Sequence, residues 1–65
     1  MPHPEKHAPS LEQRKTIFLA LVAAQDIGMT VAQSRMAIAE RFHISELWVR
    51  LIEQEGLDGN WPPLR

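Results

Sequence analysis

The sequence predicts an all-α protein with a domain of three helices. Three segments carry apolar residues at helical spacing, each follows a serine or threonine suited to cap a helix, and no segment alternates like a strand. The two ends differ from the middle. Residues 1–9 hold three of the five prolines, and the two prolines of WPPL at 61–64 cannot continue a helix. We therefore expect a flexible N-terminal arm at 1–9, a three-helix domain at 10–57, and a turn with an extended tail at 58–65.

The first helix is expected over about 11–26. Ser10 and Gln13 have the spacing of a capping box, and Gly28 suits the left-handed position just past a helix end. Inside this helix lies IFLALVAA at 17–24, eight apolar residues in succession. Every face of that stretch is apolar, whereas a surface helix shows an apolar stripe. We expect the helix to be covered on more than one side, and a homodimer formed through it would supply part of that cover.

The second helix is expected over about 31–42. Thr30 and Gln33 repeat the capping-box spacing before it, and His43 and Ile44 make the turn that follows. Ile44 is the apolar residue available to plug that turn.

The third helix begins after Ser45, which is the expected N-cap. It should run to about Glu55 and stop at Gly56, with a strong turn signal at 58–60. Its segment is acidic, because residues 45–60 hold four acidic side chains against the single cation Arg50.

The apolar spacing across the turn fits a helix-turn-helix. That motif packs two helices near a right angle, with apolar residues across the crossing, a small residue at the close approach and a plug in the turn. The residues with these properties are Ile38, Ala39, Phe42, Ile44, Val49 and Ile52. In such a motif the second of the two helices is the one that enters the DNA major groove.

The stretch IAERFHISELWVRLIEQEGL at 38–57 resembles the helix-turn-helix of the fourth region of bacterial sigma factors and of related small regulators. The matching residues are Ile38, Ala39, Phe42, Ile44 and Ser45 in the first half and Val49, Arg50, Ile52, Glu53 and Leu57 in the second. The family usually has Gly or a polar residue where this chain has His43. The resemblance covers about a third of the chain and leaves out the arm, the first helix and the tail. It implies promoter-type binding of double-stranded DNA and a role in transcription regulation, with the helix at 45–55 in the major groove.

The reading face of the third helix departs from that family, in which it is rich in Arg, Glu and Gln. At about 100° per residue, Leu47 points away from the inward-facing Val49 and Ile52, and Leu51 lies beside it. Leu can touch a thymine methyl but offers a base edge no hydrogen bond, whereas Arg50 suits guanine and Gln54 suits adenine. The candidate DNA-binding residues are Arg35, Arg41, Ser45, Glu46, Leu47, Arg50, Leu51 and Gln54.

The charge balance supports an alternative function. Seven Lys/Arg stand against eight Asp/Glu, whereas a module that binds DNA mainly through phosphates is typically basic. The alternative is a protein-interaction module that binds a larger complex, such as transcription machinery, through the apolar face of the third helix and the WPPL tail. Its candidate contacts are Leu47, Trp48, Leu51, Trp61 and Leu64. Without a partner, Trp61 and Leu64 are the residues available to fold back over the two exposed leucines.

The composition argues against several other classes. There is no cysteine, no Gly-rich phosphate loop and no cluster of acidic residues, so we expect neither an enzyme nor a cofactor. His3 and His7 are four apart, but the neighbouring prolines oppose a helix there, so we do not expect a metal site. No stretch approaches the about 20 apolar residues of a membrane span, and the N-terminus lacks the apolar run of a signal peptide. We expect a cytoplasmic protein.

Overall fold

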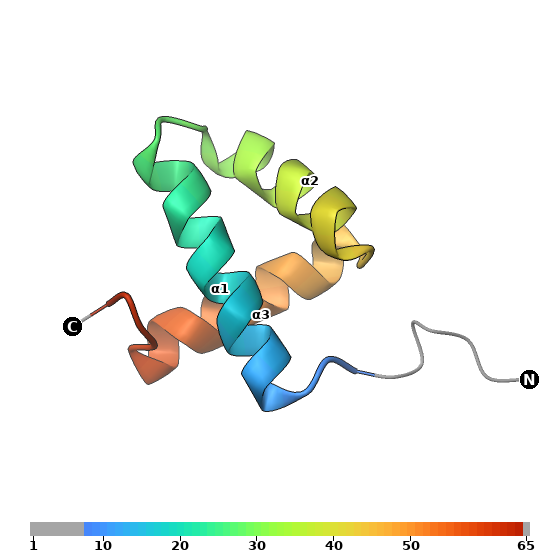
Figure 1. The fold of residues 1–65 in the computed structure, drawn as a ribbon, viewed down its shortest axis with the longest axis vertical. Coiled ribbons are helices and arrows are strands. Elements are labelled where there is room, and N and C mark those ends of the chain that lie inside the picture. Colours follow the sequence, from blue (N-terminus) through green and yellow to red (C-terminus); the bar gives the residue numbers. More distant parts are fainter. Residues whose placement is uncertain (1–7, 65) are drawn as a thin grey trace, which may run out of the picture.

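The computed structural model describes residues 8–64 and contains three helices, α1 (Leu11–Asp26), α2 (Val31–Phe42) and α3 (Glu46–Gly59), with no strand among the described residues. The all-α prediction is therefore confirmed. All three pairs of helices are in contact, and Figure 1 shows α1 crossing α3 while α2 spans from the end of α1 toward the start of α3. Most of the predicted arm, residues 1–7, lies outside the described residues. In the described part of the chain, no helix combines the length and the apolar character needed to cross a membrane.

All three helices begin at the capping residue that the sequence predicts. The Gln13 N–H donates to the Ser10 hydroxyl at 3.1 Å, and the Ser10 N–H donates to the Gln13 side-chain oxygen at 2.8 Å. Thr30 and Gln33 form the same pair of hydrogen bonds, both at 3.1 Å. Ser45 caps α3 from one side, with its hydroxyl accepting a backbone N–H of the first turn. These bonds satisfy backbone donors that the first turn of a helix leaves without a partner.

All three helices also end in the same way, in a Schellman motif. A residue in the left-handed conformation follows each helix, and the next N–H reaches back to a carbonyl five residues earlier. The left-handed residues are Gly28 (φ 103°), His43 (φ 58°) and Asn60 (φ 54°). The closing bonds run from Met29 to Ala24, from Ile44 to Ala39 and from Trp61 to Gly56. The predicted cap at Gly28 and the predicted turn at His43 and Ile44 are confirmed.

The predicted end of α3 is wrong. The helix continues through Gly56 to Gly59, and Asn60 provides the left-handed residue that ends it. Gly56 is buried within the helix because the ring of Phe18 in α1 lies directly against it, where an added Cβ would overlap the ring. This glycine therefore permits close packing of α1 on α3 instead of stopping the helix.

The core lies between the three helices and includes one residue of the tail. Its buried apolar residues are Ile17, Phe18, Leu21, Ile38, Ala39, Val49, Ile52 and Trp61. The Trp61 ring meets the Phe18 ring edge to face, with 6.0 Å between centroids. Leu19 in α1 stays 50% exposed. Within one chain, α1 is thus not covered on every side, and the homodimer through α1 stays a prediction.

Candidate nucleic-acid interface

The candidate interface is the outward face of α3. Val49, Ile52 and Gly56 point into the core and are buried. At about 100° per residue, the opposite side of the helix carries Leu47, Arg50, Leu51 and Gln54, which are the residues we call the α3 face. Leu47 is 63% exposed and Leu51 is 53% exposed, and Arg50 and Gln54 are also exposed. The structure therefore places these four candidate residues together on one open helix face.

The tail does not cover the α3 face, so that prediction is wrong. The Trp61 N–H donates to the Gly56 carbonyl at 3.0 Å, and this bond turns the chain back toward α1. The Trp61 side chain consequently packs on Phe18 and is only 9% exposed, and Lys15 Nζ lies 5.7 Å from its ring centroid. Leu64 is half-buried against the same core.

The five candidates for protein interaction divide into two groups. Trp48 is half-buried and packs against the core, as do Trp61 and Leu64 of the tail. Leu47 and Leu51 are exposed. Only the two leucines thus present most of their apolar surface to solvent.

Two of the four carboxylates of α3 point to its flanks and pair with other helices. Arg35 of α2 donates to the Glu53 carboxylate, with 2.9 Å from Nη2 to Oε1. Arg14 of α1 donates to both oxygens of Glu55, at 2.9 Å from Nε and 3.2 Å from Nη2. Both pairs join α3 to a neighbouring helix, so these two carboxylates lie beside the α3 face and have cationic partners. Arg35, a candidate for phosphate contact, is thus already engaged in an ion pair with Glu53.

A small polar network fixes the crossing of the three helices at Glu53. Ser34 of α2 is fully buried, and its hydroxyl donates to the Val31 carbonyl at 2.8 Å and accepts from the Gln25 amide at 3.1 Å. That amide also lies 3.5 Å from Glu53 Oε2. Arg50 is three residues before Glu53 on the same helix, a spacing that suits an ion pair, but Glu53 pairs with Arg35 of α2 instead. These positioning residues were missed, because contacts between helices leave no local sequence signal.

The remaining charged candidates are exposed. Arg41 extends over the Phe42 ring, with 5.3 Å from its guanidinium carbon to the ring centroid. Glu46 lies in the first turn of α3, where a negative charge is favourable because the helix dipole is positive at that end. At the other end of the α3 face, Gln54 Nε2 donates to Asp58 Oδ1 at 3.1 Å. A base contact by Gln54 would have to compete with this bond.

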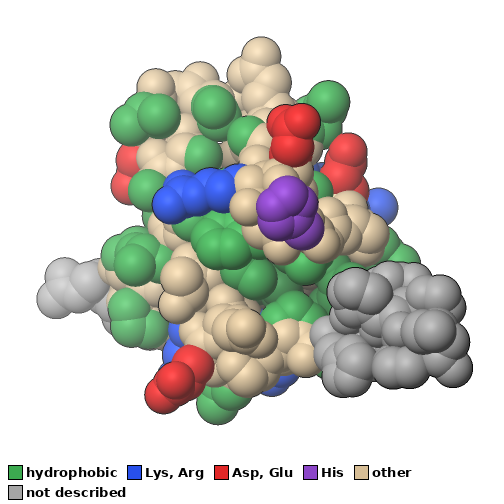
Figure 2. Space-filling model, turned by 45° about the vertical axis from the view of Figure 1, so that its right-hand side comes forward, with side chains coloured by type: hydrophobic (Ala, Val, Ile, Leu, Met, Phe, Trp, Pro, Cys, Tyr) green, Lys and Arg blue, Asp and Glu red, His purple; other side chains and the backbone are tan. Residues whose placement is uncertain are grey.

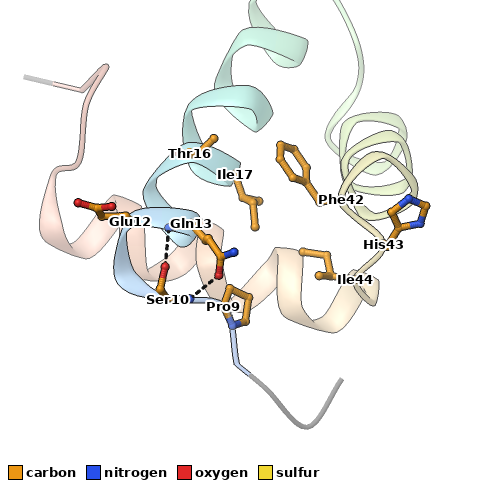
Figure 3. A pocket seen from close by; sticks show the side chains of 9 residues that line it. All are labelled: Pro9, Ser10, Glu12, Gln13, Thr16, Ile17, Phe42, His43 and Ile44. Carbon is orange, nitrogen blue, oxygen red and sulfur yellow. Dashed lines mark hydrogen bonds between the residues drawn. The ribbon is translucent and has the colours of Figure 1, made fainter. Parts of the chain in front are cut away.

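A hollow lies between the start of α1 and the α2–α3 turn. Figure 3 shows Ile17, Phe42 and Ile44 around it, with His43 pointing away and the Ser10–Gln13 capping box at its rim. Both polar side chains of that box already form hydrogen bonds. Figure 2 shows apolar side chains in the middle of the surface beside the histidine. This hollow therefore offers apolar surface more than reactive groups.

Among residues 8–64, no three His, Asp or Glu side chains gather in a way that could hold a metal ion. His3 and His7 lie outside the described residues. The α3 face is thus the surface where the candidate binding residues of this chain come together. Comparisons with protein-family models, with curated proteins and with solved structures found no match for this chain.

Proposed function

We propose that this protein binds double-stranded DNA through α3, as a small transcription regulator in which α2, the turn at 43–45 and α3 act as a helix-turn-helix. The observation that carries the proposal is the open α3 face, on which Arg50 stands between two leucines while the nearby Glu53 is held to the side by Arg35. A recognition helix needs an uncovered outer face, and its N-terminal half is the part that contacts base edges.

The contacts expected on DNA follow from residue chemistry. Arg50 can donate two hydrogen bonds to a guanine edge in the major groove, and Glu46 can accept from a cytosine amino group. Arg41, exposed at the end of α2, is placed beside the start of α3 and is the candidate for a phosphate contact. Arg14 and Arg35 contribute less, because both already neutralise carboxylates.

The number of cations that contact phosphates determines how steeply binding weakens as the salt concentration rises. The slope of log K against log[salt] is about −0.9 for each phosphate neutralised. With Arg41 as the phosphate contact, one chain should lose about 3.5-fold in affinity between 50 and 200 mM salt, and a dimer about 12-fold. The measured slope therefore distinguishes one chain from two on the DNA.

The test is fluorescence anisotropy with a labelled pool of random-sequence duplexes, at about 50 and about 200 mM salt. Arg50→Ala should weaken specific binding by about 1–3 kcal/mol. Ala32→Glu, at an exposed position in the first turn of α2, changes the net charge equally and is the matched control. Equal loss in both variants would show that binding depends on overall charge alone. No binding at low salt up to about 10⁻⁴ M protein would refute phosphate-driven DNA binding.

A second candidate function is the binding of another protein through the same face. The observation that favours it is the exposure of Leu47 and Leu51, two leucines one turn apart that nothing among residues 8–64 covers. Adjacent exposed apolar side chains often mark an interaction site. In that case Leu47→Ser should abolish association with the partner, Arg50→Ala should have little effect, and the DNA titration should show no binding.

A further inference from the structure

We infer that Leu47 and Leu51 make α3 selective for thymine, by contacting thymine C5-methyl groups in the major groove next to a base pair read by Arg50. This inference rests on the proposed function and specifies the DNA sequence class that the α3 face recognises. It gives a role to two residues that otherwise suit a DNA-reading helix poorly.

The first step concerns what a leucine can recognise in DNA. The major-groove edges of the four base pairs present hydrogen-bond donors and acceptors, and the apolar group among them is the thymine methyl. Leu47 and Leu51 keep 63% and 53% of their surface exposed, so both side chains are available for such a contact. The tail that was expected to cover them packs on Phe18 instead.

The second step concerns spacing. Residues four apart in a helix are separated by about 6 Å along its axis, and successive base pairs by about 3.4 Å. Because the path along the groove is longer per base pair than this rise, the two leucines are about one to two base-pair steps apart. Arg50 lies beside them, to one side of the α3 face. The expected site therefore contains A·T pairs next to a G·C pair.

The third step concerns charge. Arg50 is the cation of the α3 face, whereas Glu53 and Glu55 turn to the flanks and pair with Arg35 and Arg14. Glu46 lies at the edge of the α3 face, about 100° around the helix from Leu47 and about 40° from Arg50, where it can still reach a base edge. The first two turns of the α3 face thus combine apolar surface with positive charge, which suits thymine methyls set between phosphates.

The experiment removes the methyl groups and nothing else. The sequence that the full-length protein selects from the random pool is synthesised once with thymine and once with uracil, which keeps every hydrogen-bonding group. Binding to the uracil duplex should be weaker by about fourfold for each lost methyl contact, and by about 15-fold for both. Equal affinity of the unmodified protein for the two duplexes would overturn the inference while leaving DNA binding intact. Absence of binding to both duplexes would overturn the inference and the proposed function together.

Variants assign the effect to the leucines. Leu47→Ser and Leu51→Ser should each reduce the thymine-to-uracil affinity ratio by about fourfold, whereas Arg50→Ala should weaken binding to both duplexes and keep the ratio. Leu11→Ser is the matched control, because Leu11 is 49% exposed but lies in α1 instead of α3. A ratio unchanged by Leu47→Ser, or lowered equally by Leu11→Ser, would refute the assignment. Far-UV circular dichroism confirms that each variant is folded.

Discussion

Gly56→Ala should destabilise the protein even though it places a better helix former inside α3. At an open helix position, alanine is more favourable than glycine by about 1 kcal/mol. At position 56, the new methyl group would overlap the ring of Phe18, which is 1% exposed and is held on its other side by Trp61. The ring has little room to move, so either it or α1 must shift.

The magnitude follows from the two opposing effects. Overpacking of a filled core costs about 1–3 kcal/mol, and the rigid surroundings of Phe18 favour the upper half of that range. After subtraction of the helix-propensity gain, the free energy of unfolding should fall by about 1–2 kcal/mol. For a domain of this size, that corresponds to a fall in Tm of about 4–16 °C.

Urea denaturation followed by far-UV circular dichroism measures this change, with the m-value checking that the denatured state is unaltered. Ala23→Gly, at an exposed position of α1, calibrates the glycine-to-alanine difference in this protein and should cost about 1 kcal/mol. In a Phe18→Leu background, the cost of Gly56→Ala should shrink, because the smaller side chain leaves room for the methyl group. A gain in stability of about 1 kcal/mol from Gly56→Ala alone would refute the packing role and support an open helix site.

Substitutions at three further positions test other parts of the structure by the same denaturation assay. Trp61→Ala should cost about 3–5 kcal/mol, because it removes a buried ring from the core, and an unchanged urea midpoint would contradict that role. His43→Gly should stabilise the protein by up to about 1 kcal/mol, because glycine adopts the left-handed conformation at φ 58° without a Cβ penalty; a lower Tm would count against this reasoning. Thr30→Ala should cost about 1 kcal/mol through loss of the α2 cap, whereas Thr30→Ser should be nearly neutral.

The helix starts could be predicted because their signals are local. Each N-cap depends on one hydroxyl residue and on backbone three residues further along the chain, so Ser10, Thr30 and Ser45 identify the starts from sequence alone. The signals that determine where the helices end are less local. A left-handed residue ends each helix, but two of the three are His43 and Asn60, whereas Gly56 lies within a helix. A glycine in the sequence does not distinguish a helix end from a close approach of another helix, because that approach involves Phe18, which is distant along the chain.

The charge of the candidate interface also depends on contacts between residues that are distant along the chain. Residues 45–60 count as acidic in the sequence, and that count is an argument against DNA binding. In the structure, two of those carboxylates project to the sides of α3, where Arg35 and Arg14 neutralise them. A sequence count cannot include these partners, because one arginine belongs to α2 and the other to α1.

The pairing also withdraws both arginines from phosphate contact, so the folded protein has a nearly neutral α3 face instead of an acidic or a basic one. Such a face gains little from non-specific phosphate attraction, and any DNA affinity it has must come largely from contacts with base edges. Under the proposed function, sequence specificity should therefore account for more of the binding free energy than in a basic DNA-binding domain of similar size.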